Sequence, residues 1–180
     1  MKNLWAPWRM EYINSKKRVG CVFCVRDLGG EDEERRVVYR AGHSFAIMNI
    51  YPYNNGHLMA APYEHAPCLT RLTDEILLDL FKTTRLCVEV LRKVYNPEGF
   101  NTGVNIGAAA GAGFEEHLHV HVVPRWRGDC NFMPVLADTR VLPEHLDVTY
   151  KKIKAAFEET GREEQRQKHF AHRKPDSPAR

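Results

Sequence analysis

The sequence predicts an α+β domain built on a mainly antiparallel five-stranded sheet, with one long helix and a C-terminal helix. Two observations predict this class. Short segments of strand composition lie on both sides of a long segment with helical periodicity, and a second helical segment follows them. The 180 residues are enough for one domain with a proper core.

Five segments have the composition of strands. The first two flank a turn at Ala41-Gly42-His43, which is typical of a hairpin. The third follows the turn Tyr51 to Gly56 and ends at Pro62. The expected strands are residues 37–40, 45–48, 57–61, 100–106 and 117–123.

Two segments predict helices. Thr73 can cap a helix that runs to Val94, and Asn96-Pro97-Glu98-Gly99 ends it. Its apolar positions follow helical spacing and define one buried stripe: Ile76, Leu77, Leu80, Thr84, Cys87, Val88 and Leu91. A second helix is expected over residues 143–159. It would carry Leu146, Tyr150, Ile153 and Phe157 on one side.

One domain is expected over residues 1–160. It comprises an aromatic N-terminal arm (1–20), a core (21–127) and a C-terminal extension with the second helix (128–160). The arm contains Trp5 and Trp8, and we expect it to pack on its own domain or on a partner subunit. Nucleotide contact by a tryptophan is the alternative. The polar tail, 161–180, is expected to fray.

Composition and charge exclude few functions. The apolar fraction is 43% and the charged fraction 27%, which is ordinary for a globular protein. A net charge of +3 suits an anionic small molecule as well as nucleic acid. No apolar run has membrane-spanning length, and the N-terminus lacks the apolar segment of a signal peptide. We therefore expect a cytoplasmic protein with no membrane partner.

The cysteines indicate a metal site more than disulfides. Five is an odd number, which argues against a disulfide framework in a reducing compartment. Cys21-Val22-Phe23-Cys24 supplies two thiolates at a common zinc spacing. A thioredoxin-like redox pair is the main alternative. Zinc is favoured because no strand precedes the pair and no helix signature follows it.

Three alternating histidines form the most distinctive feature of the chain. His117, His119 and His121 alternate with aliphatic residues, so an extended strand would place all three imidazoles on one face. Leu118, Val120 and Val122 would bury the other face. The preceding loop is rich in Gly and Ala and offers backbone N–H groups for an anion.

Three interpretations compete for these histidines. They could be polar residues on a solvated sheet face. They could form one metal site, but His117 and His121 would lie roughly 13 Å apart in a strand, too far for two zinc ligands. In the third interpretation, one imidazole attacks phosphorus while another binds a metal ion at a separate site. An imidazole is nucleophilic at neutral pH when its other nitrogen is held by a hydrogen bond.

The glycine-rich loop matches neither of two common phosphate motifs. No Gly-Lys-Ser/Thr follows, so it is not a Walker loop. It precedes a histidine strand instead of a helix, so it is not a dinucleotide fingerprint.

The histidine segment resembles the motif of the histidine triad nucleotide hydrolases and transferases. The match over 21–127 includes residues 45–49, Gly56-His57-Leu58, Asn105-x-Gly107 and Pro124-Arg125. The flanking segments 4–12 and 126–133 resemble the bacterial branch related to diadenosine tetraphosphate phosphorylases. This resemblance implies a sheet domain that forms a homodimer whose two sheets join.

The resemblance also implies residue roles. His119 would be the nucleophile that carries a transient adenylate, supported by His121 and His57, which would contact phosphate. Asn49 would bind the ribose hydroxyls. The phosphates would be held by Asn105, Gly111, Ala112, Gly113 and His121. Zinc, as a structural ion, would be bound by Cys21, Cys24, His65 and His117.

The implied activity is cleavage of an adenosine polyphosphate, diadenosine tetraphosphate being favoured, at the α-phosphate. Ala112 and Gly113 stand where many relatives place a hydroxyl or amide, which leaves phosphorolysis and hydrolysis both open. One alternative is hydrolysis of a purine nucleoside phosphoramidate or a related adenylate conjugate. Another is a zinc-stabilised nucleotide- or nucleic-acid-binding module without turnover. The partner expected is a purine nucleotide in preference to nucleic acid.

Overall fold

The computed structural model describes residues 20–26, 30–112, 114–129 and 142–171. The predicted aromatic arm therefore lies outside the described residues except for Gly20. Gly113 and the last part of the tail, 172–180, lie outside them as well.

Five antiparallel strands form one sheet. They are β1 (Val37–Arg40), β2 (Ser44–Met48), β3 (Leu58–Pro62), β4 (Gly99–Val104) and β5 (Val120–Arg125). Their order in the sheet is β1-β2-β3-β5-β4, and each neighbouring pair is antiparallel. The predicted five-stranded antiparallel sheet is confirmed.

The long helix α3 (Asp74–Tyr95) begins and ends as its sequence predicts. The Thr73 side chain accepts a hydrogen bond from the Ile76 N–H, and Asn96 ends the helix in the left-handed conformation with φ of 44°. Three short helical turns complete the described chain between the longer elements. They are α2 (Asp32–Arg35), η1 (Leu69–Arg71) and η2 (Ala108–Ala110).

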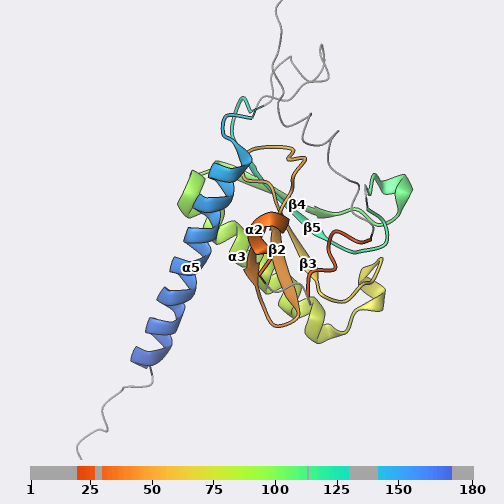
Figure 1. Ribbon diagram of the computed structural model, residues 1–180, viewed down its shortest axis with the longest axis horizontal. Helices are drawn as coiled ribbons and strands as arrows, with labels where there is room; N and C mark the ends of the chain where they lie inside the picture. The colour runs from red at the N-terminus through yellow and green to blue at the C-terminus, as the bar shows by residue number, and fades with distance from the viewer. Residues whose placement is uncertain (1–19, 27–29, 113, 130–141, 172–180) are drawn as a thin grey trace, which may run out of the picture.

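The C-terminal helix α5 (Leu146–Ala171) is longer than the sequence predicted. The expected end was Glu159, with a frayed tail from Gly161. The helix continues because the following residues, Arg, Glu, Gln and Lys, are good helix formers, and one internal Gly costs only about 1 kcal/mol relative to Ala. Its last turns project beyond the sheet, as Figure 1 shows in blue.

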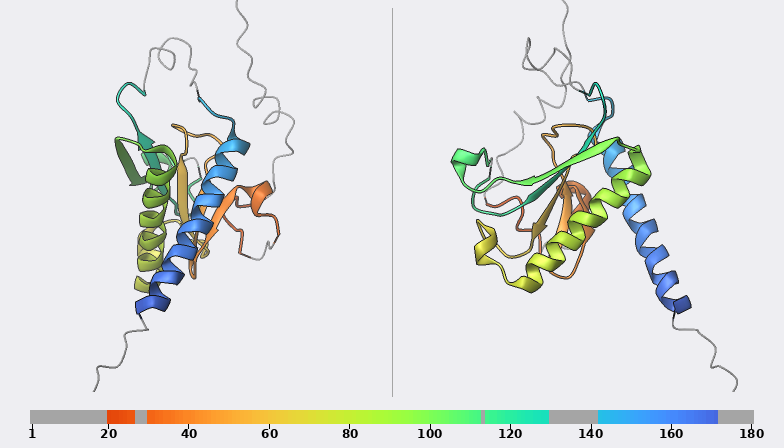
Figure 2. Two further views of the ribbon diagram at one scale, coloured as in Figure 1. Left: turned by 90° about the vertical axis from the view of Figure 1, so that its left-hand side faces the viewer. Right: turned by 180° about the vertical axis from the view of Figure 1, so that it is seen from behind.

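Both long helices cover the same face of the sheet. Figure 2 shows α3 and α5 side by side against the strands. The core between these layers is made of Val38, Ala46, Met48, Leu58, Cys87, Val90, Leu91, Val122, Tyr150, Ile153 and Phe157. The predicted faces of both helices thus lie in the core. On the other face of the sheet, Phe23 and Val25 pack against residues of β1, β2 and β3.

The histidine segment differs from its predicted form. The strand was expected to start at His117, but β5 begins at Val120, so His117 and His119 precede the sheet. The Leu118 N–H bonds to the Ala66 carbonyl at 2.7 Å, which ties this segment to the loop after β3. Leu118, Val120 and Val122 are buried, as predicted. The bend before Val120 lets the histidines point to different neighbours.

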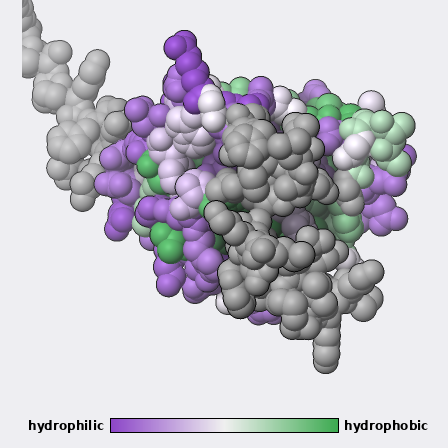
Figure 3. Space-filling model, turned by 90° about the horizontal axis from the view of Figure 1, so that it is seen from above, coloured by the Kyte–Doolittle hydropathy of each residue, from purple (hydrophilic) through white to green (hydrophobic). Residues whose placement is uncertain are grey.

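Figure 3 shows a surface in which hydrophilic residues make up much of the described area and hydrophobic residues form small, separate areas. Within the described ranges, the helices include none long and apolar enough to cross a membrane.

Candidate active site and metal centre

The sheet brings His57 and His121 together. His57 directly precedes β3, and the β3–β5 ladder pairs Met59 with His121. Because side chains alternate along a strand, His57, Met59 and His121 share the face opposite the helices. His57 Nε2 lies 3.0 Å from His121 Nδ1. The ring of His119 lies 4.8 Å from that of His121, so the three predicted catalytic histidines form one group.

The hydrogen bond of His119 presents a nucleophilic nitrogen. Its Nδ1 lies 2.9 Å from the backbone carbonyl oxygen of His117. A carbonyl can only accept, so Nδ1 carries the proton and Nε2 carries the lone pair. Burial lowers the pKa of His119 below its ordinary value, which keeps the ring neutral at pH 7. This is the protonation state that a nucleophilic imidazole requires.

The partners of His57 and His121 fix their tautomers in the same way. The Tyr53 backbone N–H donates to His57 Nδ1 at 3.0 Å, so neutral His57 carries its proton on Nε2. That proton is donated to His121 Nδ1. Burial lowers the pKa of His121 to about 4, so the ring is neutral and its own proton lies on Nε2. His121 is thus arranged as a hydrogen-bond donor beside His119.

Asn49 and Tyr53 surround this pair. Asn49 Nδ2 lies 3.3 Å from His57 Nδ1, and Asn49 Oδ1 accepts from the Tyr51 N–H at 2.9 Å. The ring of Tyr53 lies 4.6 Å from that of His57 and 5.5 Å from that of His121. Sequence reasoning did not single out Tyr53, because Tyr51 to Gly56 carried only the composition of a turn.

The glycine-rich loop starts opposite His119. Gly103 pairs with His121 and Val104 with Val120, so the chain leaves β4 at Asn105, across from His119. Asn105 Nδ2 donates to the Gly111 carbonyl at 3.4 Å and closes the loop. The Gly111 N–H is bonded to the Ala108 carbonyl at 2.9 Å. The Gly111 N–H is therefore already used in a hydrogen bond within this turn.

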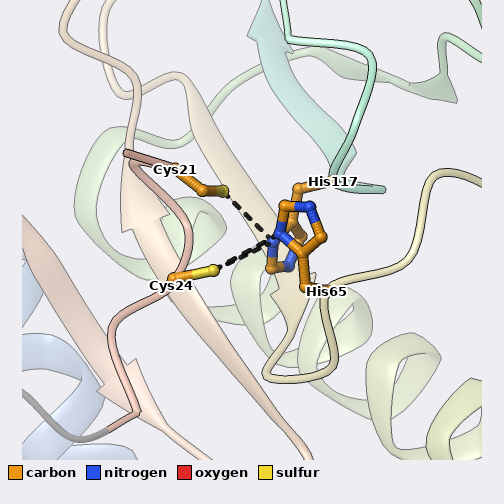
Figure 4. Close-up of side chains that lie close together, drawn as sticks. All are labelled: Cys21, Cys24, His65 and His117. Atoms are coloured by element: carbon orange, nitrogen blue, oxygen red, sulfur yellow. Dashed lines mark hydrogen bonds between the residues drawn. The ribbon is translucent and has the colours of Figure 1, made fainter. Parts of the chain in front are cut away.

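The predicted metal ligands converge from three parts of the chain. The ligand atoms of Cys21, Cys24, His65 and His117 all lie within 4.8 Å of one another. Figure 4 shows the two cysteines facing the two imidazoles. His117 Nδ1 lies 3.3 Å from the Cys21 sulfur and 3.9 Å from the Cys24 sulfur. His65 Nδ1 lies 3.4 Å from the Cys24 sulfur.

This donor set fits zinc. A tetrahedral ion with bonds of about 2.0–2.3 Å requires ligand atoms roughly 3.3–3.8 Å apart, close to the separations observed. His117 Nε2 donates to the Pro62 carbonyl at 2.8 Å, which leaves the Nδ1 lone pair facing the thiols. Burial lowers the pKa of His117 to about 4 and raises that of the Cys21 thiol to about 11. An ion would bind the neutral imidazole directly and would displace the thiol proton.

Phe23 connects the cysteines to His119. It lies between Cys21 and Cys24 and is 3% exposed. Its ring stacks on that of His119 with a centroid distance of 4.6 Å and lies 5.4 Å from that of His117. Sequence reasoning missed this residue. Its position between the two cysteines was the available signal, but only the fold shows that the loop lies over His119.

Comparison with known proteins gives consistent matches. The family model of the HIT domain matches residues 31–128. The AP-4-A phosphorylase of Mycobacterium tuberculosis is 40% identical over 85% of this chain and 83% of that protein. The asymmetrical bis(5'-nucleosyl)-tetraphosphatase of Schizosaccharomyces pombe is 36% identical over 52% of this chain and 51% of that protein.

Solved structures agree with these matches. A Zn-bound histidine triad family protein from Mycobacterium smegmatis has a TM-score of 0.62 and 26% identity, covering 79% of this chain and 96% of that one. A member of the HIT family from Bacillus subtilis has a TM-score of 0.55 and 25% identity, covering 88% of this chain and 99% of that one.

Proposed function

The chain belongs to the HIT family, and from that premise we propose that it cleaves adenosine polyphosphates at the α-phosphate through a nucleotidyl-histidine intermediate. Diadenosine tetraphosphate is the favoured substrate, because the M. tuberculosis relative is named AP-4-A phosphorylase. The observation that carries the mechanism is the hydrogen bond from His119 Nδ1 to the His117 carbonyl. It leaves the Nε2 lone pair of a neutral imidazole available for attack.

In the first step, His119 Nε2 forms a bond to the α-phosphorus and the bridging P–O bond breaks. The electron pair leaves with the polyphosphate, which is ATP when the substrate is diadenosine tetraphosphate. His121 donates its Nε2–H to a phosphate oxygen, and His57 holds His121 in that tautomer. Because the leaving polyphosphate is a stable anion, the neutral histidine pair needs only to donate a hydrogen bond to the phosphate and orient it.

In the second step, an acceptor attacks the adenylate and the P–N bond breaks, which restores neutral His119. Inorganic phosphate as acceptor gives ADP, and water gives AMP. The loop residues Ala112 and Gly113 supply no side-chain donor, so the acceptor would be positioned by other groups. Asn49 would bind the ribose hydroxyls. Asn105 with Gly111, Ala112 and Gly113 would hold phosphate, which requires the Gly111 amide to exchange its present bond with Ala108.

Cys21, Cys24, His65 and His117 would hold a structural zinc ion. The ion would supply a cross-link between the N-terminal segment, the loop after β3 and the segment before β5. Such a site needs reduced thiols, which fits the cytoplasmic setting expected from the sequence.

The chain would act as a homodimer. In the described sheet β4 lies at one edge, and its Asn101, Thr102 and Gly103 are exposed. An exposed edge strand can pair with a second copy and extend the sheet.

Incubation with diadenosine tetraphosphate, with and without inorganic phosphate, followed by product chromatography, tests this function. ATP with ADP only when phosphate is present identifies a phosphorylase, whereas cleavage without phosphate identifies a hydrolase. No cleavage in either condition contradicts the proposal. His119→Ala is the matched variant: its turnover should fall about 10⁴-fold or more while nucleotide binding stays measurable. Retained turnover would exclude His119 as nucleophile.

A further inference from the structure

Two residues outside the histidine motif, Asn54 and Asp129, hold the turn that contains Tyr53 in place. Asn54 Nδ2 donates to Asp129 Oδ2 at 2.8 Å and to the Pro124 carbonyl at 3.1 Å, so both of its amide hydrogens are used. Asn54 Oδ1 accepts from the Asn55 N–H at 3.0 Å. Pro124 lies in β5, three residues beyond His121, and Asp129 follows that strand. Asn54 therefore connects the turn before His57 to the strand that carries His121.

Asp129 is itself held rigidly. Its Oδ2 accepts from Arg125 Nε at 2.7 Å and its Oδ1 from Arg125 Nη2 at 2.9 Å, a bidentate ion pair. The Trp126 N–H also donates to Oδ2 at 3.2 Å. The Asp129 side chain is only 8% exposed. A carboxylate with these partners offers Asn54 a fixed acceptor.

The hydrogen bonds of Asn54 with Asp129 and Pro124 affect the position of the groups that contact His57. The Tyr53 N–H that donates to His57 Nδ1 belongs to the residue preceding Asn54, and the His57 N–H bonds to the Asn54 carbonyl at 3.2 Å. A shift of the Asn54 side chain would move the Tyr53 amide away from His57. The contact of His57 Nδ1 with Asn49 Nδ2, at 3.3 Å, is longer and would hold the tautomer less firmly. Part of the molecules would then carry the proton on Nδ1, and in these Nε2 would no longer donate to His121.

We propose that Asn54 and Asp129 are positioning residues whose hydrogen bond holds the Tyr53 N–H on His57 and thereby fixes the proton arrangement of the His57–His121 pair. The effect on turnover rests on the proposed function, because the pair orients the phosphate beside His119. The effect on the tautomer does not, since it can be measured in the protein without substrate.

The test uses Asn54→Ala, Asp129→Ala and the double variant in the full chain. Asp32→Ala is a matched control, because Asp32 also accepts from two nitrogens of an arginine, Arg40, away from the histidines. Two quantities are measured: the tautomers of the histidine rings by ¹⁵N NMR, and kcat and KM with diadenosine tetraphosphate.

In the unmodified protein and in Asp32→Ala, we expect one tautomer of His57, protonated at Nε2. In Asn54→Ala and Asp129→Ala, His57 should lose this single tautomer. Their kcat should fall about tenfold to hundredfold, as expected for a misplaced group, with KM changed less than about threefold. The double variant should resemble Asn54→Ala, because both changes remove the same bond.

An unchanged His57 tautomer in both variants would overturn the proposal, whatever happens to kcat, because the residues would then act only on stability. Additive losses in the double variant would also overturn it. If Asp129→Ala does not fold, the result of Asn54→Ala is sufficient, since that change leaves the Arg125–Asp129 ion pair in place. If the unmodified protein cleaves no dinucleotide, the proposed function fails, but the NMR result still decides this inference.

Discussion

His117 and His119 lie two residues apart in one motif and are both buried, yet they present opposite ring nitrogens. His117 donates from Nε2 to the Pro62 carbonyl and turns its Nδ1 toward two thiols. His119 donates from Nδ1 to the His117 carbonyl and leaves its Nε2 lone pair available. The difference teaches that a backbone carbonyl fixes which ring nitrogen keeps the proton and therefore which nitrogen has the free lone pair: Nδ1, facing the thiols, in His117 and Nε2 in His119.

The two regions also differ in what they contribute. The cluster around His117 joins distant parts of the chain and would contribute mainly stability. The group around His119 would contribute turnover. Phe23, which lies between the cysteines and stacks on His119, is the contact through which the first region can act on the second.

Removing a proposed metal ligand should have the largest effect on stability, and it should affect the cluster around His117 more than the group around His119. Cys24→Ala should abolish zinc binding and lower the free energy of unfolding by about 4 kcal/mol, or roughly 10 °C in Tm, because the ion contributes folding energy directly. Metal analysis measures the bound zinc, and thermal unfolding measures the change in Tm. Cys68→Ala is the control, since Cys68 lies outside the cluster. Zinc bound stoichiometrically by Cys24→Ala would refute the assigned ligand set.

A smaller expected effect concerns how the stability of the protein depends on pH through His121, in the proposed catalytic group. The pKa of His121 falls from 6.5 to about 4 on folding, so below pH 6.5 the unfolded chain binds a proton that the folded protein does not. Stability from this group is complete above pH 6.5 and is lost as pH falls toward 4, by about 1.4 kcal/mol per pH unit.

Urea unfolding at several pH values, with His121→Gln as the comparison, measures this slope. The difference in unfolding free energy between the two proteins should change by about 3 kcal/mol across the window. A difference that does not vary with pH would mean that burial does not suppress protonation of His121.

Much of the fold follows from sequence patterns, because each depends on local spacing. Thr73 and Asn96 bound α3, and the apolar positions Tyr150, Ile153 and Phe157 define the buried side of α5. The end of α5 was placed too early, because Gly161 was given more weight than the helix formers around it.

The sequence indicated which cysteine and histidine side chains would lie close together, but not which hydrogen bonds they would form. Alternation alone placed the histidines in one strand, whereas β5 begins only at Val120 and the Leu118 N–H bonds to the Ala66 carbonyl outside the sheet. Tautomers depend on carbonyls such as that of Pro62, which come from other parts of the fold. Phe23 and Asn54 were missed for the same reason, since their partners are distant in sequence.

The most direct test of this division is to locate the adenylyl group on the protein. The enzyme would be mixed with diadenosine tetraphosphate without phosphate, quenched within milliseconds in alkali, where phosphoramidates persist, then digested and mapped by mass spectrometry. We expect adenylyl on His119 and none on His117. Adenylyl on any other residue, or cleavage with no adenylyl-enzyme at any quench time, would contradict it.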